Sequence, residues 1–429
     1  MDGQRNLRSQ SLLTVATLGL LAGTSACSLA LDFQQCESNA DCEGLGVAGA
    51  VCHVDGYCSI SGDDAGSSLS GTPRIGFVYV GPVGDHGWTK THDDSRLYLE
   101  QAIPGVVTFS EPLVTPSRAP DVIRGFIEDE GANIVIGTSF DFLGPVQEAA
   151  ANNPDVNFLI CSGFVGGPNL GSYFARMYMP KWLTGRLAGH MTKTNRIGIV
   201  GSVVIPETVR HVNAFARGVR SVNPDAVVMV RWVNEWFDIE AETAAAQELI
   251  DAGADFLITG TDTPTALTVA DGQVTANGDP IYVVGYDNPD TCKFAPDICL
   301  TSIYYNWGPM VEEIINSMQD GSWDPLTPVW EPMRGDAARS GAYMVPLNEN
   351  IVPVGTIFDI EEQLAAVAAG DVNVFAGPLV DNTGATRLDG ATATDDDLLE
   401  MCWFVEGVIE PSADSNEPAI VPGGCGGIY

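Results

Sequence analysis

The sequence predicts an α/β fold with two lobes, each built on a parallel sheet. Apolar strand-like runs alternate with helical stretches and short loops, in two successive series. The chain has 429 residues, which is too long for one simple core. Two similar Rossmann-like halves joined in mid-chain suggest a hinge and a cleft between the lobes, an arrangement that suits ligand capture by closure.

The first series begins at Arg74–Val80, a β-branched and aromatic run that is typical of a buried parallel strand. Further strands are expected at Val106–Phe109, Ile134–Gly137 and Asn157–Ser162, with helices at Thr89–Ala102, Arg118–Glu130 and Leu143–Asn152. In the second series, strands are expected at Arg196–Gly201, Val227–Val233, Phe256–Thr259 and Tyr282–Gly285, with helices at Pro206–Val222, Ile239–Ala252 and Thr263–Asp271.

These segments divide the chain into parts. Lobe 1 is expected to comprise residues 72–178 with about 287–304, and lobe 2 residues 179–286 with about 305–345. Residues 346–429, with a helix near Ile360–Ala369, are expected to pack back on the lobes. Residues 27–71 form a small cysteine-rich module and a linker, because Ser59–Gly71 is rich in Gly, Ser and Asp.

Residues 1–26 have the features of a signal peptide. Arg5 and Arg8 precede a short apolar stretch, Ser11–Ala22, which is too short for a comfortable transmembrane helix. Cys27 follows small residues, as in the lipobox of a bacterial lipoprotein, although Thr24 stands where Leu is usual. We therefore expect a protein of the bacterial cell envelope, lipid-anchored to a membrane through Cys27 and facing the periplasm or the exterior. Ordinary cleavage beside an incidental cysteine is the alternative.

The other cysteines fit an oxidising compartment. Four of them crowd into the N-terminal module and suggest two disulfides, with a zinc site as the alternative. These four are Cys36, Cys42, Cys52 and Cys58. Cys292 with Cys299, and Cys402 with Cys425, are further plausible pairs, and Cys161 is left over as a buried small hydrophobe.

The formal charge is −36, from 56 acidic and 20 basic residues. Such a surface repels phosphate backbones, so nucleic-acid binding is not expected. The acidity is typical of a solubilising or salt-adapted surface.

No convincing catalytic arrangement is present, and no enzyme activity or cofactor is expected. The chain has no Gly-x-Ser-x-Gly elbow and no Walker loop, and no Gly-x-Gly-x-x-Gly run follows any of the expected strands. Four residues could in principle bind a metal: His86, His92, Asp93 and Asp94. Consecutive residues of a helix cannot all face one point, so we expect Asp93 and Asp94 to be first-turn acids at a helix start.

Aromatic and acidic residues follow several predicted strands. In open α/β sheets, ligands bind beyond the carboxyl ends of the strands, which is where these loops lie. The residues are Trp88, Phe140, Asp141, Trp236, Asp262 and Asp287. Rings can sandwich a flat heterocycle and carboxylates can accept hydrogen bonds from its N–H groups. For each residue taken alone, a capping Asp or a packed aromatic is the simpler interpretation.

The order of several motifs resembles the basic membrane protein family. The motifs are Gly84–Trp88, Gly137–Phe140, Leu183–Gly189, Gly285–Asp287 and Leu300–Ser302. The resemblance runs from about Arg74 to at least Trp323 and implies a type I periplasmic-binding-protein-like fold. It also implies a lipid-anchored substrate-binding protein that delivers purines or purine nucleosides to an ABC permease.

The resemblance implies roles for some residues. Trp88 would lie against the base, Phe140 and Asp141 would hold its other face or edge, and Asp287 would meet ribose hydroxyls. The chain departs from the nucleoside binders in two places. Thr89-Lys90 replaces their Asn-Asp, and Thr301–Tyr305 lacks the lysine of their Thr-Ser-x-x-Lys, with Asn306 and Trp307 following. These departures favour a nucleobase over a nucleoside, with Asn306 as a further candidate contact.

Two other functions stay open. A nucleoside hydrolase would need His86, His92, Asp93 and Asp94 to converge on a substrate. A sensor or surface-interaction lipoprotein would use the cysteine-rich module to engage a partner.

Overall fold

The computed structural model describes residues 50–52, 58–60, 69 and 71–411, and the single positions 417, 419 and 425. The expected signal peptide and Cys27 lie outside these residues, as do Cys36 and Cys42. In the N-terminal module, β1 (Ala50–Cys52) pairs with β2 (Cys58–Ile60) as an antiparallel hairpin. The expected disulfides or zinc site of this module therefore rest on residues outside the described part.

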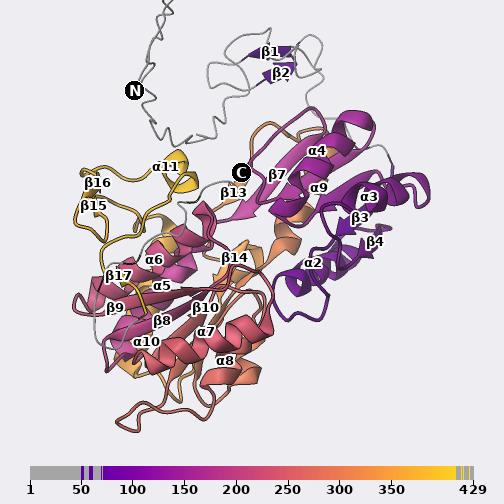
Figure 1. Ribbon diagram of the computed structural model, residues 1–429. Helices are drawn as coiled ribbons and strands as arrows, with labels where there is room; N and C mark the ends of the chain where they lie inside the picture. Colours follow the sequence, from indigo (N-terminus) through magenta and orange to yellow (C-terminus); the bar gives the residue numbers. More distant parts are fainter. Residues whose placement is uncertain are drawn as a thin grey trace, which may run out of the picture.

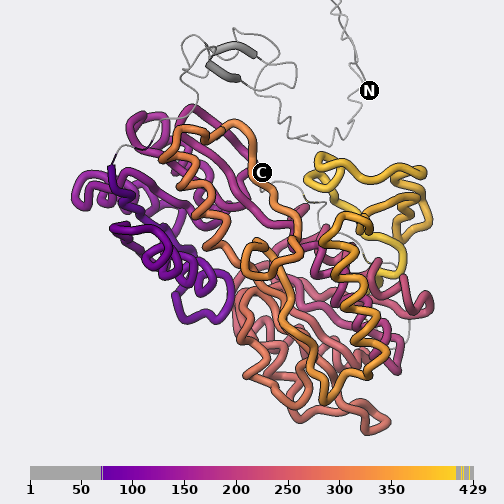
Figure 2. Tube along the Cα trace, turned by 180° about the vertical axis from the view of Figure 1, so that it is seen from behind, coloured from indigo at the N-terminus to yellow at the C-terminus, as the bar shows by residue number. Residues whose placement is uncertain are grey.

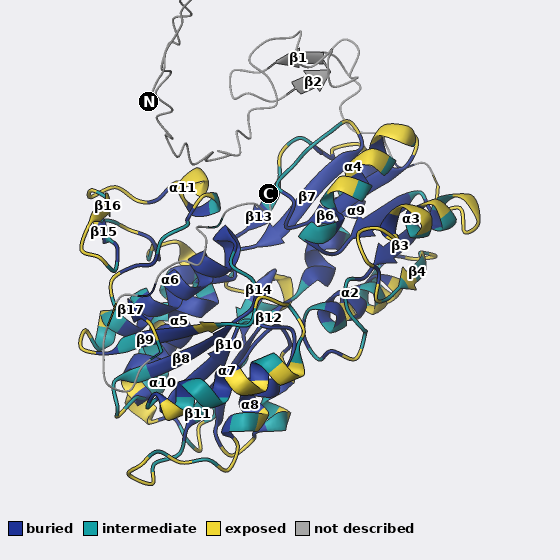
Figure 3. Ribbon diagram, viewed as in Figure 1, coloured by how far each residue is buried: buried dark blue, intermediate teal, exposed yellow. Residues whose placement is uncertain are grey.

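Lobe 1 is built on a six-stranded sheet in the order β13-β7-β6-β5-β3-β4, with all neighbours parallel (Figure 1). Its strands are β3 (Arg74–Val78), β4 (Val107–Glu111), β5 (Ile134–Gly137), β6 (Asn157–Cys161), β7 (Leu170–Ala175) and β13 (Val329–Glu331). Its helices are α2 (Trp88–Ala102), α3 (Ala119–Glu128), α4 (Leu143–Asn152) and α9 (Trp307–Asp320), with η1 (Phe140–Phe142) before α4. The apolar central strands are buried on both faces, as expected when helices cover both sides of a parallel sheet (Figure 3).

Lobe 2 is built on a seven-stranded sheet in the order β14-β12-β11-β10-β8-β9-β17, in which β14 alone runs antiparallel to its neighbour. Its strands are β8 (Arg196–Gly201), β9 (Val227–Trp232), β10 (Phe256–Thr259), β11 (Tyr282–Gly285), β12 (Cys299–Tyr305), β14 (Ala342–Met344) and β17 (Val408–Ile409). Its helices are α5 (Tyr178–Met191), α6 (Pro206–Val222), α7 (Ile239–Asp251), α8 (Thr265–Ala270) and α10 (Val354–Ala369), with η2 (Thr291–Phe294).

Within residues 71–411 the chain crosses between the sheets at three places. It leaves lobe 1 after β7, returns to it between β12 and α9, and leaves it again between β13 and β14. The expected division was wrong here: β12, within 287–304, belongs to lobe 2, whereas α9 and β13, within 305–345, belong to lobe 1. Figure 2 shows α9, in orange, among the elements of lobe 1. There α9 packs against α2. Alternation of strands and helices reveals each element but not the sheet that it joins.

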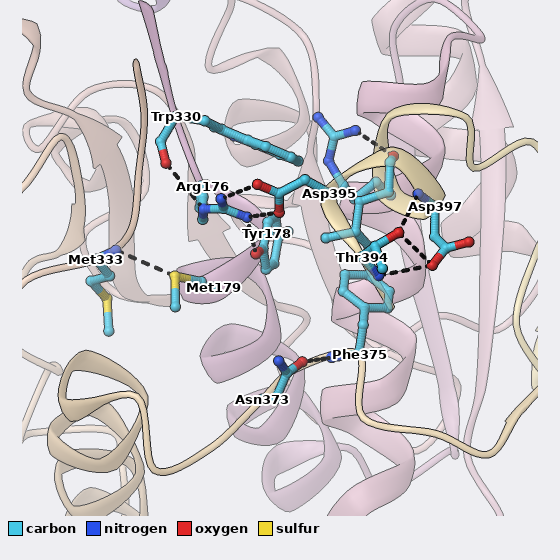
Figure 4. A network of polar contacts seen from close by, with 12 residues as sticks. Arg176, Tyr178, Met179, Trp330, Met333, Asn373, Phe375, Thr394, Asp395 and Asp397 are labelled. Carbon is cyan, nitrogen blue, oxygen red and sulfur yellow. Dashed lines mark hydrogen bonds and ion pairs between the residues drawn. The ribbon is translucent and has the colours of Figure 1, made fainter. Parts of the chain in front are cut away.

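The segment after lobe 2 contacts both lobes. It contains β15 (Leu379–Val380), β16 (Thr386–Leu388) and α11 (Asp395–Leu399). The short 3-10 helix η3 (Ala337–Arg339) lies earlier, between β13 and β14. The guanidinium of Arg176, just after β7, donates to both carboxylate oxygens of Asp395 at 2.7 Å (Figure 4). The same guanidinium lies 4.2 Å from the ring of Trp330 on β13 and donates to its carbonyl. On lobe 2, Arg217 of α6 donates to the carbonyls of Val374 and Ala376.

Two expected disulfides are present in the described part of the chain. Cys292 is bonded to Cys299, and Cys402 to Cys425. Cys161 is free and buried in the lobe 1 sheet, as expected for a small hydrophobe. Within the described residues, no helix combines the length and the hydropathy needed to cross a membrane.

Candidate functional site

A pocket lies between the carboxyl edges of the two sheets. In lobe 1, β3 has β4 on one side and β5 on the other, and in lobe 2, β8 has β9 and β10. Crevices at such reversals of strand order are the usual ligand sites of open α/β sheets. The pocket has about 440 Å³ of empty space, including the part open to solvent. Its lining is Val80, Trp88, Ser139, Phe140, Ser162, Ile205, Glu207, Trp236, Gly260, Asp262, Tyr286 and Asp287.

Aromatic rings reach the pocket from both lobes. Trp88 and Phe140 come from lobe 1, and Trp236 and Tyr286 from lobe 2. Trp88 is the first residue of α2, and its Nε1 donates to the carbonyl of Thr138 at 2.7 Å. Its ring is therefore fixed by the neighbouring strand end, which presents an apolar surface of set orientation to a ligand.

Three buried carboxylates share the pocket wall. Glu207 and Asp262 are each 6% exposed, and Asp287 is 1% exposed. Both carboxylate oxygens of Asp287 lack a hydrogen-bond partner within the described part of the protein. Burial raises the pKa of Asp262 and of Asp287 well above its ordinary value, and the neighbouring carboxylates add to the effect. Buried acceptors without donors are costly, so a donor-bearing ligand would relieve them.

A buried lysine interacts with one of these acids, Asp287. Lys181 of α5 donates to the carbonyl of Thr259 at 3.0 Å, and its Nζ lies 3.6 Å from the centre of the Tyr286 ring. Burial lowers the pKa of Lys181 to about 7, although Asp287 opposes the shift. The ammonium therefore partly balances Asp287 while its hydrogen bond positions the strand end of β10.

The lobes touch across the pocket. Ser162, after β6, donates from Oγ to Oε2 of Glu207 on α6 at 2.9 Å. Gly87 lies so close to the backbone of Asp262 that an added Cβ would be 2.2 Å from its carbonyl oxygen. The rings of His86 and Phe294 are 4.9 Å apart. The structure thus shows a closed cleft with the pocket at its centre.

The structure brings together five of the seven predicted ligand residues: Trp88, Phe140, Trp236, Asp262 and Asp287. It does not place Asp141 or Asn306 on the pocket wall. Asp141 lies in η1, and burial together with Glu235 raises its pKa. Asn306 donates from its side chain to the carbonyls of Ala337 and Ala338, a structural role at a crossing between lobes.

Sequence reasoning missed several wall residues. Glu207 lies at the start of the predicted helix Pro206–Val222, just after the loop that follows the predicted strand Arg196–Gly201. The rule that ligand residues follow the carboxyl ends of strands could therefore have found it. Ser139 and Ser162 also stand at strand ends. Lys181 gave no signal, because it lies on α5, whose residues were noted as a motif but not predicted as a helix.

The four residues that could in principle bind a metal do not converge. Burial against the Trp88 and Trp307 rings lowers the pKa of His92 to about 3, and His86 packs on Phe294. Asp93 pairs with Arg96, and Asp94 with Lys90. The expectation of first-turn acids was wrong, because α2 begins at Trp88 and both acids fall in its second turn. Among the described residues, no group of three or more potential ligands could hold a metal ion.

Comparisons with known proteins agree with this architecture. Residues 72–325 match the family described as ABC transporter substrate-binding protein PnrA-like. A purine-binding protein of Brucella abortus is 35% identical over 339 residues, covering 78% of this chain and 92% of that protein. A putative ABC transporter glucose-binding protein of Haloferax volcanii is 30% identical over 350 residues, covering 81% and 83%.

A solved ABC transporter solute-binding protein from Conexibacter woesei shares the fold. It superposes with a TM-score of 0.54 at 19% identity, over 70% of this chain and 98% of that one. The match of the family spans more than half of the sequence and includes the loops that line the pocket. This confirms the expected fold and the expectation of a binding protein instead of an enzyme. The chain belongs to the PnrA-like family of ABC transporter substrate-binding proteins.

Proposed function

We propose that this protein captures a purine-like heterocycle, with a nucleobase favoured over a nucleoside, and delivers it to an ABC permease. The observation that carries the proposal is a closed pocket whose walls combine aromatic rings from both lobes with buried carboxylates. Rings suit the faces of a flat heterocycle, and carboxylates suit its N–H edge. The relative named as a purine-binding protein supports the same ligand class.

The preference for a nucleobase rests on the groups near the end of β12. Thr301 and Ser302 donate from their hydroxyls to backbone carbonyls, of Val345 and of Asn288. Tyr305 is buried and stacks on Trp307 at 4.3 Å. None of these residues lines the pocket, so this strand offers no side chain there to hold a sugar.

A ligand panel tests the proposal. Purified protein would be screened by thermal shift and calorimetry against purine bases, their nucleosides, and glucose as the ligand named for the archaeal relative. A ligand at 100 times its Kd stabilises the folded state by about 2.7 kcal/mol, so a true ligand gives a clear rise in Tm. Binding of glucose with no response to any base or nucleoside would overturn the proposal.

We also propose that the protein is anchored through a lipid on Cys27 and faces the periplasm or the exterior. The sequence before Cys27 supports this, as a signal peptide followed by small residues. In the native host, wild-type protein should fractionate with membranes and carry an acylated N-terminal cysteine by mass spectrometry. Cys27→Ala should move it to the aqueous fraction, and an unmodified Cys27 in the mature wild-type protein would refute the anchor.

A further inference from the structure

The pocket wall carries several acidic side chains. Glu207, Asp262 and Asp287 line it, and a fourth buried acid, Asp85, is close enough to interact electrostatically with Asp262 and Asp287. Asp85 is already satisfied, because it accepts hydrogen bonds from the backbone N–H groups of Gly87, Thr89 and Lys90 at the start of α2. The three wall carboxylates remain as the groups that meet a ligand.

These three carboxylates can accept further hydrogen bonds. A bound N–H donor favours the ionised form of a buried acid, and in that form a carboxylate accepts up to about four hydrogen bonds and donates none. Asp287 receives none from the described residues, and Glu207 receives one from Ser162. Lys181, the cation beside them, is turned to the carbonyl of Thr259 and the face of Tyr286. A ligand therefore meets acceptors on this side of the pocket.

Asp287 is held toward the site by an unusual backbone. Its φ of 65° is in the left-handed region, which non-glycine residues rarely adopt. Ser162 has a φ of 67° and supplies the hydroxyl that holds Glu207. Such conformations persist where the surrounding structure enforces them, and they are concentrated at functional sites.

We propose that Glu207, Asp262 and Asp287 make the pocket selective for a heterocycle that presents amino or protonated ring N–H groups to them, and that they exclude its anionic relatives. This inference rests on the proposed function. An amino group pairs with the carboxylates, whereas an oxo group in the same place leaves them without donors. A phosphate or an ionised ring adds repulsion in a site largely shielded from water.

Matched ligands test this selectivity. Adenine and hypoxanthine differ by an amino and an oxo group on the same ring atom, and adenosine and its monophosphate differ by a charged group. Calorimetry at neutral pH should show adenine binding about tenfold or more tightly than hypoxanthine, since an unpaired buried acceptor costs about 1–3 kcal/mol. Urate and adenosine monophosphate should give no measurable binding.

Variants assign the effect to the carboxylates. Glu207→Gln and Asp287→Asn each keep the side-chain shape but can donate, so they should bring the adenine-to-hypoxanthine affinity ratio toward one. Glu235→Gln is the matched control, because Glu235 is exposed and adjacent to the wall residue Trp236. It should leave the ratio unchanged, and circular dichroism would confirm that each variant is folded.

The outcomes separate this inference from the proposed function. If no purine binds, the proposed function fails. If purines bind but adenine and hypoxanthine bind equally, or the monophosphate binds as well as adenosine, only the selectivity is overturned. If wild type prefers adenine and neither carboxylate variant changes the ratio, the assignment to these residues is wrong.

Discussion

Trp88 has neighbours on two sides. One side of its ring lines the pocket, and the other lies against an aromatic cluster formed by His92, Tyr305 and Trp307, at ring-centre distances of 4.9, 5.3 and 5.4 Å. Tyr305 ends β12 and Trp307 begins α9, so they flank one of the crossings between the lobes. The Trp88 ring therefore also contacts a connection between the lobes. The residue therefore contributes to both the candidate site and the core of the closed form.

Truncation of Trp88 should weaken binding and also cost stability. Trp88→Ala is expected to reduce ligand affinity about 30-fold or more, from lost stacking and burial. Because the ring is partly buried, the same change should lower the free energy of unfolding by about 2 kcal/mol or more. Trp88→Phe is the matched variant: it keeps a ring but loses the bond to Thr138, so it should bind better than the Ala variant. Calorimetry and urea unfolding measure both effects, and wild-type affinity in Trp88→Ala would mean that the ring only packs.

Asp262 should make folding depend on pH. Burial raises its pKa in the folded protein well above the ordinary value of 3.8. Above pH 3.8 the unfolded chain loses this proton while the folded protein keeps it, so raising the pH destabilises the fold until the folded pKa is reached. Asp262→Asn does not titrate, and its stability relative to wild type should rise from about pH 4 toward neutrality. Unfolding free energies across that range test this, and a constant difference would contradict it.

Helices α5 and α6 approach each other closely because glycines form their contact. A Cβ on Gly185 would lie 2.1 Å from the carbonyl oxygen of Phe215, and one on Gly218 would lie 2.0 Å from that of Trp182. No side chain fits at such distances, so the two backbones meet directly. This contact explains the run Leu183–Gly189 and holds Lys181 on α5 in place.

Gly218→Ala should therefore destabilise lobe 2. The added methyl group meets backbone atoms that cannot move independently, and overpacking of this kind costs about 1–3 kcal/mol or more. Gly355→Ala on α10 is the control, because nothing lies within 4 Å of its added Cβ, and it should be neutral or slightly stabilising. Chemical unfolding of both variants measures the difference. Equal stability of the two would show that α5 and α6 can separate at little cost.

The closed arrangement of the whole molecule depends on contacts between lobes that are distant in sequence. Gly87 meets Asp262, Ser162 meets Glu207, and Arg176 meets Asp395 of the C-terminal segment. Three crossings of the chain link the lobes, so closure moves two folded bodies about a hinge. The pocket exists in this form because both lobes contribute walls.

Gly87→Ala should hinder closure without unfolding either lobe. Its methyl group would lie 2.2 Å from the Asp262 carbonyl oxygen, so the lobes must stay further apart. We expect ligand affinity to fall by about tenfold or more, and small-angle scattering with excess ligand should show a larger radius of gyration than for wild type. Gly84→Ala, in the same loop with nothing within 4 Å of its Cβ, should behave as wild type. Unchanged affinity and radius in Gly87→Ala would mean that ligand binding tolerates a wider cleft.

Much of the fold was predictable because its signals are local. The strand Ile134–Gly137 and the helix Leu143–Asn152 were expected with the bounds that the structure gives them, since buried parallel strands are short apolar runs. Strand β7 was missed, because Leu170–Ala175 follows β6 after a loop instead of a helix. Helix α5 was missed because its buried face, which includes Lys181 and two glycines, lacks a clear apolar stripe.

The candidate site was predictable as far as it follows strand ends. Trp88, Asp262 and Asp287 were found by that rule, and their common pocket confirms that the edges of the two sheets meet. Asp141 satisfies the same rule, and Asn306 was a candidate from the departures from the nucleoside binders. Both lie away from the pocket wall, because a position at the edge of a sheet does not give the direction of a side chain.

The amino-acid order alone determines the two α/β lobes, the family, and the strand ends at which ligand residues can occur, because periodicity and turn residues act over short stretches of chain. Only the tertiary structure decides which sheet receives β12 and β13, that Lys181 interacts with Asp287, and that Ser162 reaches Glu207. These outcomes depend on packing between segments far apart in sequence. Burial and pairing of charges arise from that packing, so no local pattern records them.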